Sequence, residues 1–188
     1  MRKALAALAI GAATMGAVGL AAGPAAAEER TCRGTIGATT LDNVRVPQGA
    51  TCTLNGTYVK GTIKVERSAK LYANTVRVVG NVQGENAALV RVVKDSRVGG
   101  SVQVVQGGGA AVVDSRVNGD ILYDEQRAKV TVGYTTVGGN VQAFQNTGGV
   151  NIAFNRIDGN LQCKANDPAP TGGYNVVQGN KEDQCRRL

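Results

Sequence analysis

Apolar and polar positions recur in the same order around a glycine that returns along most of the chain. The aligned glycines are Gly61, Gly80, Gly100, Gly119, Gly139, Gly159 and Gly179. Their spacings are 19, 20, 19, 20, 20 and 20 residues, which is too regular for chance even in a chain with 26 glycines. A fixed period of this size is the signature of a repeat protein.

Positions at fixed distances from the glycine keep their character. The second residue before it is always apolar and β-branched: Val59, Val78, Val98, Val117, Val137, Ile157 and Val177. The second residue after it is apolar until the last repeat: Ile63, Val82, Val102, Ile121, Val141, Leu161 and then Lys181. Alternating β-branched positions are typical of strands rather than helices. Residues 130–132 and 150–152 predict a further short strand per repeat.

A repeat of about 20 residues with only short strands and turns predicts one coil of a parallel β-helix. We expect an all-β, single-stranded solenoid of about seven coils, which at ~4.8 Å per coil makes a rod of roughly 30 Å. Right-handed winding is expected, as for β–crossover–β connections generally. A left-handed helix built on shorter hexapeptide repeats is the alternative.

The repeated glycine is expected to mark a corner where a side chain does not fit or where φ must be positive. The next residue is polar in every repeat: Thr62, Asn81, Ser101, Asp120, Asn140, Asn160 and Asn180. Such side chains, stacked one coil apart, can form a hydrogen-bonded ladder. A phosphate-binding loop is excluded, because that motif occurs once and is followed by a helix.

The N-terminal residues predict a secretion signal over residues 1–27. Arg2 and Lys3 precede a run rich in Ala, Leu and Gly, and three alanines at 25–27 precede Glu28. A membrane anchor is the alternative, because the run is just long enough to span a bilayer. Residues 28–188 are then expected to form one domain, with a cap and first coil at 28–58, regular coils at 59–163 and a capping coil at 164–188. No later segment is expected to cross a membrane.

The four cysteines predict two disulfides, because an even number is typical of exported chains. The chain has no His and no C-x-x-C pair, so no metal site and no cofactor are expected. Cys32 and Cys52 are 20 residues apart, and Cys163 and Cys185 are 22 apart. Residues stacked one coil apart lie within the Cα range of a disulfide. We therefore predict the pairs Cys32–Cys52 and Cys163–Cys185, one at each end.

Charge favours anionic partners other than nucleic acid. The net charge is +7, and without Arg2 and Lys3 it is +5. The basic residues form no dense cluster, so a nucleic-acid partner is not expected. They do share a column three residues before the glycine: Arg77, Arg97, Arg116 and Arg156, with Thr136 interrupting. Such a stripe could hold the carboxylates or sulfates of an acidic glycan. A solvated face that limits aggregation is the simpler interpretation.

Five residues before the glycine, the column reads Thr75, Asp95, Asp114, Tyr134, Phe154 and Tyr174. Asp95 and Asp114 resemble the stacked carboxylates that β-helical polysaccharide lyases and hydrolases use, and Arg97 and Arg116 lie nearby in the sequence. They are weak catalytic candidates, because Asp-Ser is ordinary turn chemistry. The absence of His excludes His-based triads.

Tyr134, Phe154 and Tyr174 have two interpretations. Facing solvent, three stacked rings would make a sugar-binding platform. Facing inward, they would be core stacking, which is the interpretation we favour.

The stretch GNLQCKANDPAPTGGYNVVQGNKEDQC at residues 159–185 resembles the end of a group of small, uncharacterised secreted proteins of actinobacteria. The resemblance implies secretion and a disulfide-closed final coil, and it implies no activity. A looser likeness to β-helical pectate lyases concerns the fold alone.

The sequence therefore predicts an exported, non-catalytic binding module. Its expected partners are an acidic glycan, a cell-wall polymer or another protein. A small polysaccharide lyase or hydrolase acting on an acidic glycan is the alternative, and a scaffold that associates end to end is a third. The terminal disulfides and Lys181 argue against the scaffold, so a monomer is expected.

Overall fold

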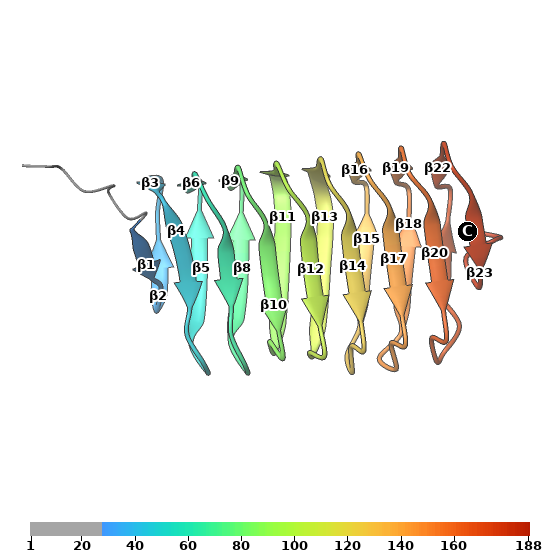
Figure 1. Cartoon of the computed structure of the whole chain (residues 1–188), viewed down its shortest axis with the longest axis horizontal. Coiled ribbons are helices and arrows are strands. Elements are labelled where there is room, and N and C mark those ends of the chain that lie inside the picture. The colour runs from blue at the N-terminus through green and yellow to red at the C-terminus, as the bar shows by residue number, and fades with distance from the viewer. Residues whose placement is uncertain (1–27) are drawn as a thin grey trace, which may run out of the picture.

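A computed structural model describes residues 28–188, and the predicted secretion signal at 1–27 lies outside this range. Residues 28–188 contain strands and turns and no helix, and every strand pairs in parallel with the equivalent strand of the next coil. The coils stack into a straight rod (Figure 1). This confirms the predicted parallel β-solenoid, which has about eight turns.

Each coil has three sides. Sheet A forms the first side from nine strands: β1 (Glu29–Thr31), β4 (Asn43–Val46), β7 (Ile63–Val65), β10 (Val82–Glu85), β12 (Val102–Val105), β14 (Ile121–Asp124), β17 (Val141–Phe144), β20 (Leu161–Lys164) and β23 (Lys181–Asp183). Sheet B forms the second side from β2 (Gly34–Ile36), β5 (Thr51–Asn55), β8 (Lys70–Asn74), β11 (Leu89–Val98), β13 (Gly109–Val117), β15 (Val130–Gly133), β18 (Val150–Ala153) and β21 (Thr171–Gly173).

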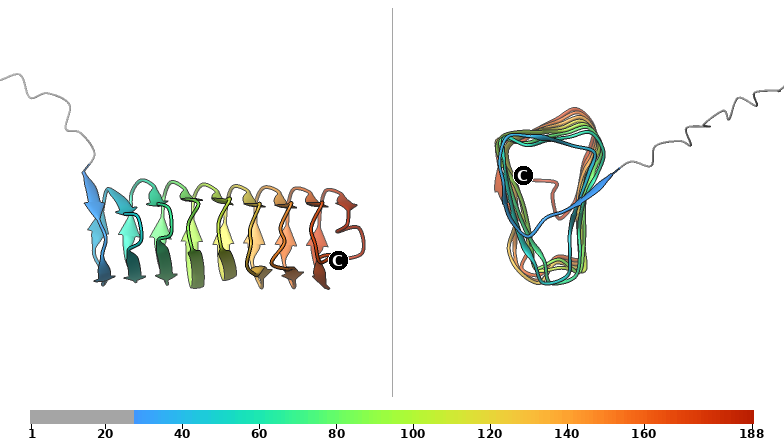
Figure 2. Two further views of the ribbon diagram at one scale, coloured as in Figure 1. Left: turned by 90° about the horizontal axis from the view of Figure 1, so that it is seen from below. Right: turned by 90° about the vertical axis from the view of Figure 1, so that its left-hand side faces the viewer.

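The third side is short and precedes the glycine. It consists of β3 (Thr40–Leu41), β6 (Tyr58–Val59), β9 (Arg77–Val78), β16 (Thr136–Val137), β19 (Arg156–Ile157) and β22 (Val176–Val177). In two coils the ends of β11 and β13 take this place, since Arg97 pairs with Arg77 and Arg116 pairs with Thr136. Seen end-on, the coils superimpose on one elongated outline (Figure 2, right).

The structure has one turn more than the seven repeated glycines indicate. This additional turn is the first along the chain, and in it Asp42 occupies the position of the repeated glycine. The backbone N–H of Gly61 donates to the carbonyl oxygen of Asp42 (2.6 Å), as the N–H of Gly80 donates to that of Gly61 (3.0 Å). Asn43 then begins the polar column. Counting glycines gave seven coils because this first corner has an aspartate.

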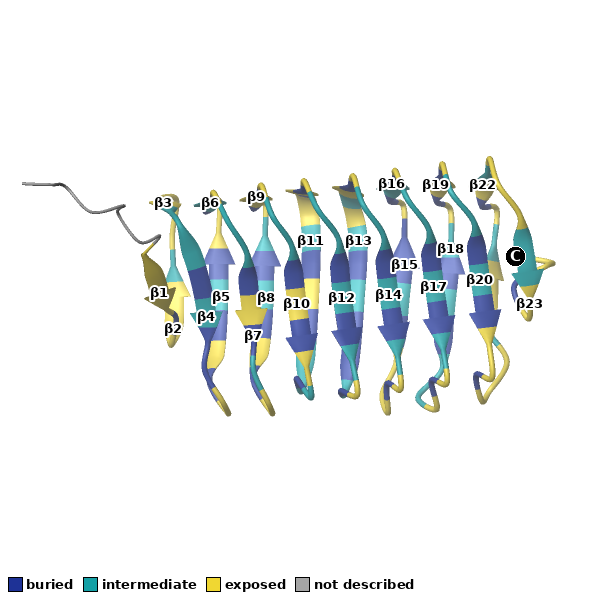
Figure 3. Cartoon of the chain, in the orientation of Figure 1, coloured by how far each residue is buried: buried dark blue, intermediate teal, exposed yellow. Residues whose placement is uncertain are grey.

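The two predicted apolar columns form the core. Val59 through Ile157 on one side and Ile63 through Leu161 on the other are buried in every coil (Figure 3). Val177 and Lys181, in the last coil, are only partly buried. The alternation along each strand therefore reports directly which side chains point inward.

The repeated glycines are required for space and not for backbone conformation. None of the seven has a positive φ, so of the two expected reasons for glycine the structure bears out the lack of room for a side chain. A Cβ built on Gly159 would lie 2.6 Å from the carbonyl oxygen of Gly139 and 2.6 Å from Oδ1 of Asn140. The corner is tight because the previous coil fills it.

The predicted polar column forms a ladder, which we call the glycine-corner ladder. Each side-chain oxygen accepts a hydrogen bond from the backbone N–H of the equivalent residue in the next coil, at 2.6–3.3 Å. The ladder contains Asn43, Thr62, Asn81, Ser101, Asp120, Asn140, Asn160 and Asn180.

The other two corners turn through residues in the left-handed region, in most coils a single non-glycine residue, although Lys94 and Asp95 both adopt it. At the corner after sheet B, φ lies between 48° and 60° for Thr75, Asp95, Asp114, Tyr134, Phe154 and Tyr174. At the corner after sheet A, φ lies between 51° and 58° for Ser68, Asn86, Gln106, Glu125, Gln145, Ala165 and Asp183. The residue that follows turns inward at both corners, except for Gln184 in the last coil, which is exposed, so both corners carry buried polar side chains where the sequence supplies them.

These inward residues form two further ladders that the sequence analysis missed. Oδ1 of Asn155 accepts the N–H of Thr135 (3.0 Å), and Oδ1 of Asn175 accepts the N–H of Asn155 (3.1 Å). The other ladder contains Gln126, Asn146, Asn166 and Gln184. In both, an earlier N–H donates to a later side chain, opposite to the glycine-corner ladder.

Both predicted disulfides are present. Cys32 and Cys52 have their Cα atoms 5.6 Å apart near one end, and Cys163 and Cys185 have theirs 5.2 Å apart near the other. The chain after Cys185 turns across the end of the last coil (Figure 2), and Leu188 packs against the core there. The C-terminal end of the core is therefore covered by the chain itself.

Candidate functional site

The arginine column forms a stripe on the third side. Arg77, Arg97 and Arg116 are register partners in three consecutive coils, and their side chains are exposed. Within residues 28–188, none of the three has a carboxylate at ion-pair distance. Arg77 places its guanidinium carbon 5.6 Å from the ring centroid of Tyr58, its register partner in the preceding coil. We call Arg77, Arg97 and Arg116 the arginine stripe.

The fourth predicted arginine is separated from the stripe. Thr136 lies between Arg116 and Arg156 in the register, and Arg156 Nε lies 3.7 Å from Oδ1 of Asp158. The structure therefore brings three of the four arginines together and pairs the fourth with a neighbouring carboxylate.

Shallow recesses flank the stripe. One, of about 360 Å³, is lined by Asp95, Arg97, Asp114, Arg116 and Tyr134, with the intervening serines. We call it the Tyr134 recess. The other, of about 320 Å³, is lined by the three arginines of the stripe together with Val79, Gly99 and Asn118. Arg97 and Arg116 are the residues that both recesses share.

Asp95 and Asp114 lie at the left-handed corner, where their side chains are exposed. The serines that follow complete the turn: Ser96 Oγ donates to the carbonyl of Val93 (2.6 Å), and Ser115 Oγ donates to that of Val113 (2.9 Å). The structure thus agrees with the expected Asp-Ser turn. It also places both carboxylates and two arginines around one recess.

The aromatic residues face solvent, so the favoured prediction of core packing is wrong. Tyr134, Phe154 and Tyr174 are 65%, 46% and 82% exposed. Their backbones take the same left-handed corner as the aspartates, and this conformation directs the side chain outward. The ring centroids are 4.9 Å apart in both pairs, with planes within 6° of parallel. The rings therefore cover one another's faces, and only the two end rings keep a free face.

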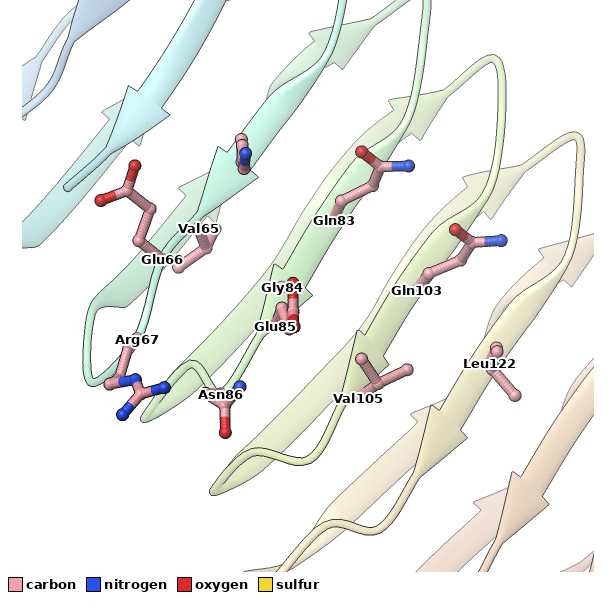
Figure 4. A pocket seen from close by; sticks show the side chains of 11 residues that line it. Val65, Glu66, Arg67, Gln83, Gly84, Glu85, Asn86, Gln103, Val105 and Leu122 are labelled. Carbon is pink, nitrogen blue, oxygen red and sulfur yellow. The ribbon is translucent and has the colours of Figure 1, made fainter. Parts of the chain in front are cut away.

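A further hollow lies on the outer face of sheet A, and the sequence did not indicate it. It measures about 640 Å³ and contains outward side chains of β7, β10 and β12 and of the following turns (Figure 4). Its polar groups include Lys64, Glu66, Gln83, Glu85 and Gln103. Its lining has no aromatic ring, so it offers hydrogen bonds but no stacking surface.

Glu66 at the edge of this hollow is already engaged. Nη1 of Arg45 donates to its carboxylate at 3.0 Å, as does the backbone N–H of Gln48. These hydrogen bonds, with Arg45 first, hold the pKa of Glu66 below its ordinary value. The arrangement ties the first coils together and leaves this carboxylate less available to a ligand.

Farther along sheet A, Asp124 is the most unusual carboxylate. Its Oδ1 is buried and has no hydrogen-bond partner within residues 28–188. Burial, followed by the nearby charge of Glu125, raises its pKa. Phe144 and Lys164 are its partners in the next two coils and line a recess of about 310 Å³ with it.

Within residues 28–188, no group of three or more Cys, Asp or Glu side chains is arranged to hold a metal ion. The described part of the chain also has no helix long and apolar enough to cross a membrane. No protein-family profile matches the sequence, and no curated protein or solved structure matches it either.

Proposed function

We propose that this chain is an extracellular, non-catalytic β-helix module that binds acidic glycans or anionic cell-wall polymers along the arginine stripe. The observation that carries the proposal is the register of Arg77, Arg97 and Arg116, three exposed guanidinium groups in consecutive coils with no ion-pair partner in residues 28–188. The two terminal disulfides fit an oxidising compartment.

Stacked like charges disfavour the folded rod. Side chains directly opposite on neighbouring strands interact, and like charges in that position are destabilising. A solvated face needs charge for solubility, but it does not need one sign in three successive register positions. A polyanion that runs along the rod would relieve the repulsion, because it presents a negative group to each arginine.

Arginine suits this partner. Its planar guanidinium pairs with carboxylates and sulfates through two parallel hydrogen bonds. Successive coils repeat at about 4.8 Å, so the stripe presents regularly spaced donors to a polymer. Because the site is exposed, the attraction should be screened by salt.

The test is retention on immobilised dextran sulfate, with unmodified dextran as the neutral comparison. We expect retention at low salt that falls as salt rises, and loss in the double variant Arg97→Ala with Arg116→Ala. The matched control is Arg91→Ala with Lys129→Ala, which removes the same charge from two exposed positions, one on β11 and one just before β15. Equal retention of the two double variants on dextran sulfate, or no retention of the native chain, would overturn the proposal.

One observation supports a second candidate, a lyase or hydrolase of acidic polysaccharides. Asp95 and Asp114 share the Tyr134 recess with Arg97 and Arg116, so proton-transfer groups and carboxylate-binding groups meet there. Both carboxylates are exposed. Burial is the usual means of tuning a catalytic carboxylate, so we place binding first. Shortening of polygalacturonate that stops in Asp95→Asn with Asp114→Asn would establish the enzyme instead.

A further inference from the structure

The aromatic stack has Tyr134 at one end and Tyr174 at the other, and the surroundings of the two end rings differ. Phe154 covers one face of the Tyr134 ring. In the preceding coil the same corner is occupied by Asp114, whose short side chain cannot cover the second face. Tyr134 accordingly contributes to the lining of the Tyr134 recess.

Three kinds of group meet in this recess. Tyr134 supplies a flat apolar ring face, Arg97 and Arg116 supply guanidinium donors, and Asp95 and Asp114 supply carboxylate acceptors. The two arginines are register partners, so their side chains leave adjacent coils in the same direction. None of the four charged side chains has an ion pair within the described residues, so all four remain available to a ligand.

We infer that the Tyr134 recess binds a single uronic acid residue, a sugar ring that carries one carboxylate. This inference rests on the proposed glycan-binding function and narrows its ligand. The C–H face of the sugar packs on the free face of Tyr134, because an aromatic ring offers a large apolar surface. The sugar carboxylate pairs with Arg97 and Arg116, and its hydroxyl groups donate to Asp95 and Asp114.

The charge pattern selects against other ligands. A neutral sugar leaves both guanidinium groups without an anionic partner. A densely sulfated sugar seated in this recess brings several negative charges next to Asp95 and Asp114, which repel it, whereas the recess on the other flank of the arginine stripe has no carboxylate in its lining. One carboxylate and several hydroxyl groups match the two arginines and the two aspartates. The volume of about 360 Å³ falls at the lower end of the range of small-molecule sites, which suits one or two sugar rings.

The other end of the stack provides a matched control. Tyr174 also has one free ring face and is the more exposed of the two tyrosines. It does not line the Tyr134 recess, because it lies two coils beyond Tyr134 toward the C-terminal end. Removing either tyrosine takes one terminal ring from the stack, but only Tyr134 faces the recess.

The experiment is isothermal titration of the disulfide-bonded chain, residues 28–188, with trigalacturonate, and with neutral galactotriose for comparison. We expect binding of trigalacturonate only. Tyr134→Ala should weaken it about tenfold, within the range of an aromatic contact, while Tyr174→Ala leaves it unchanged. Tyr134→Phe should retain binding, because it keeps the ring. Arg116→Ala should weaken binding tenfold or more, through loss of charge-assisted hydrogen bonds.

Equal effects of Tyr134→Ala and Tyr174→Ala would overturn the inference, as would equal binding of the neutral trisaccharide. The result is separable from the proposed function. If the native chain is retained on dextran sulfate but does not bind trigalacturonate, the arginine stripe stands and the uronate site fails. If Tyr134→Ala loses trigalacturonate but keeps dextran sulfate retention, both are supported as distinct uses of the same side.

Discussion

Tyr134 and Phe154 lie one coil apart on the outside of the rod, with ring centroids 4.9 Å apart and planes 6° from parallel. Both residues hold a left-handed backbone, with φ of 50° and 60°. That conformation costs a residue with a side chain about 1–2 kcal/mol. Ring stacking contributes about 0.5–1.5 kcal/mol per pair. The two effects are of similar size, so the stack can offset the strain of its own corner.

Phe154, the middle ring, tests this balance. Phe154→Ala removes both ring pairs and keeps a side chain in the left-handed corner, so we expect it to lower the free energy of unfolding by about 1–3 kcal/mol. Phe154→Gly removes the same rings and relieves the corner, so it should be the more stable of the two variants. Urea unfolding measures both. An alanine variant as stable as the native chain would show that the stack contributes nothing.

Gly139 tests the packing of the glycine corner. A Cβ there would collide with the side chain of Asp120 and lie 2.9 Å from the carbonyl carbon of Gly119. We expect Gly139→Ala to lower the unfolding free energy by about 1–3 kcal/mol, as overpacking does. Gly133→Ala is the control, because its nearest contact would be 3.7 Å away and its φ is not positive. Thermal melts that shift equally for both variants would contradict the steric account.

Asn155 tests the buried ladder. Its Nδ2 donates to the carbonyl of Val132 (2.9 Å), and its Oδ1 accepts the N–H of Thr135 (3.0 Å). Asn155→Ala leaves these buried backbone groups without partners, so we expect a loss of about 2–4 kcal/mol. Asn151→Ala removes an exposed amide from the same coil and should cost about 0.5 kcal/mol or less. Chemical denaturation of the two variants makes the comparison.

Asp124 predicts a pH effect of definite sign. Burial raises its pKa above the ordinary 3.8, so the folded chain holds this proton more tightly than the unfolded chain does. Stability associated with this group is therefore present at low pH and lost as the pH rises through its raised pKa. Asp124→Asn should stabilise the chain at about pH 7 and change little at about pH 3.

Glu66→Gln is the control of opposite sign. Arg45 lowers the pKa of Glu66, so its contribution is present at neutral pH and lost as the pH falls. The variant should be destabilised near neutral pH and should approach the native chain in acid. Unfolding midpoints across the pH range measure both variants. If the Asp124→Asn curve ran parallel to the native curve, the carboxylate would have no perturbed ionisation.

The sequence predicted the features that depend on periodicity. A spacing of 19 or 20 residues was enough to place the apolar columns and the glycine-corner ladder, because one coil fixes which residues stack. It also brought together the two cysteine pairs, which are 20 and 22 residues apart and so lie about one coil apart. The count of coils was one short because Asp42 replaces the repeated glycine in the first turn. The buried ladder from Gln126 to Asn166 also repeats every 20 residues, and that repeat was available in the sequence.

Periodicity alone could not show whether the side chains of the aromatic column point into the core or into solvent. Periodicity shows that Tyr134 and Phe154 stack, but the sign of φ decides whether they point inward or outward. Tyrosine and phenylalanine are uncommon in the left-handed region, so neither signals it. Asp95 and Asp114 in the same column were the better indication of a corner. The hollow near Gln83 and Gln103 depends on the relative lengths of outward side chains, which follow no repeat.

The opposed directions of the ladders make the rod a polar object. At the glycine corner, N–H groups point back toward the N-terminal end, as from Asn160 to Asn140; at the buried corner, they point forward, as from Thr135 to Asn155. The N-terminal and C-terminal edges of each coil therefore present different hydrogen-bonding groups. A coil inserted in the reverse direction would place N–H donors opposite N–H donors. Coils can therefore be duplicated or deleted only in the same direction as their neighbours. The length of the rod can change by whole coils, while its cross-section and the orientation of every coil stay the same.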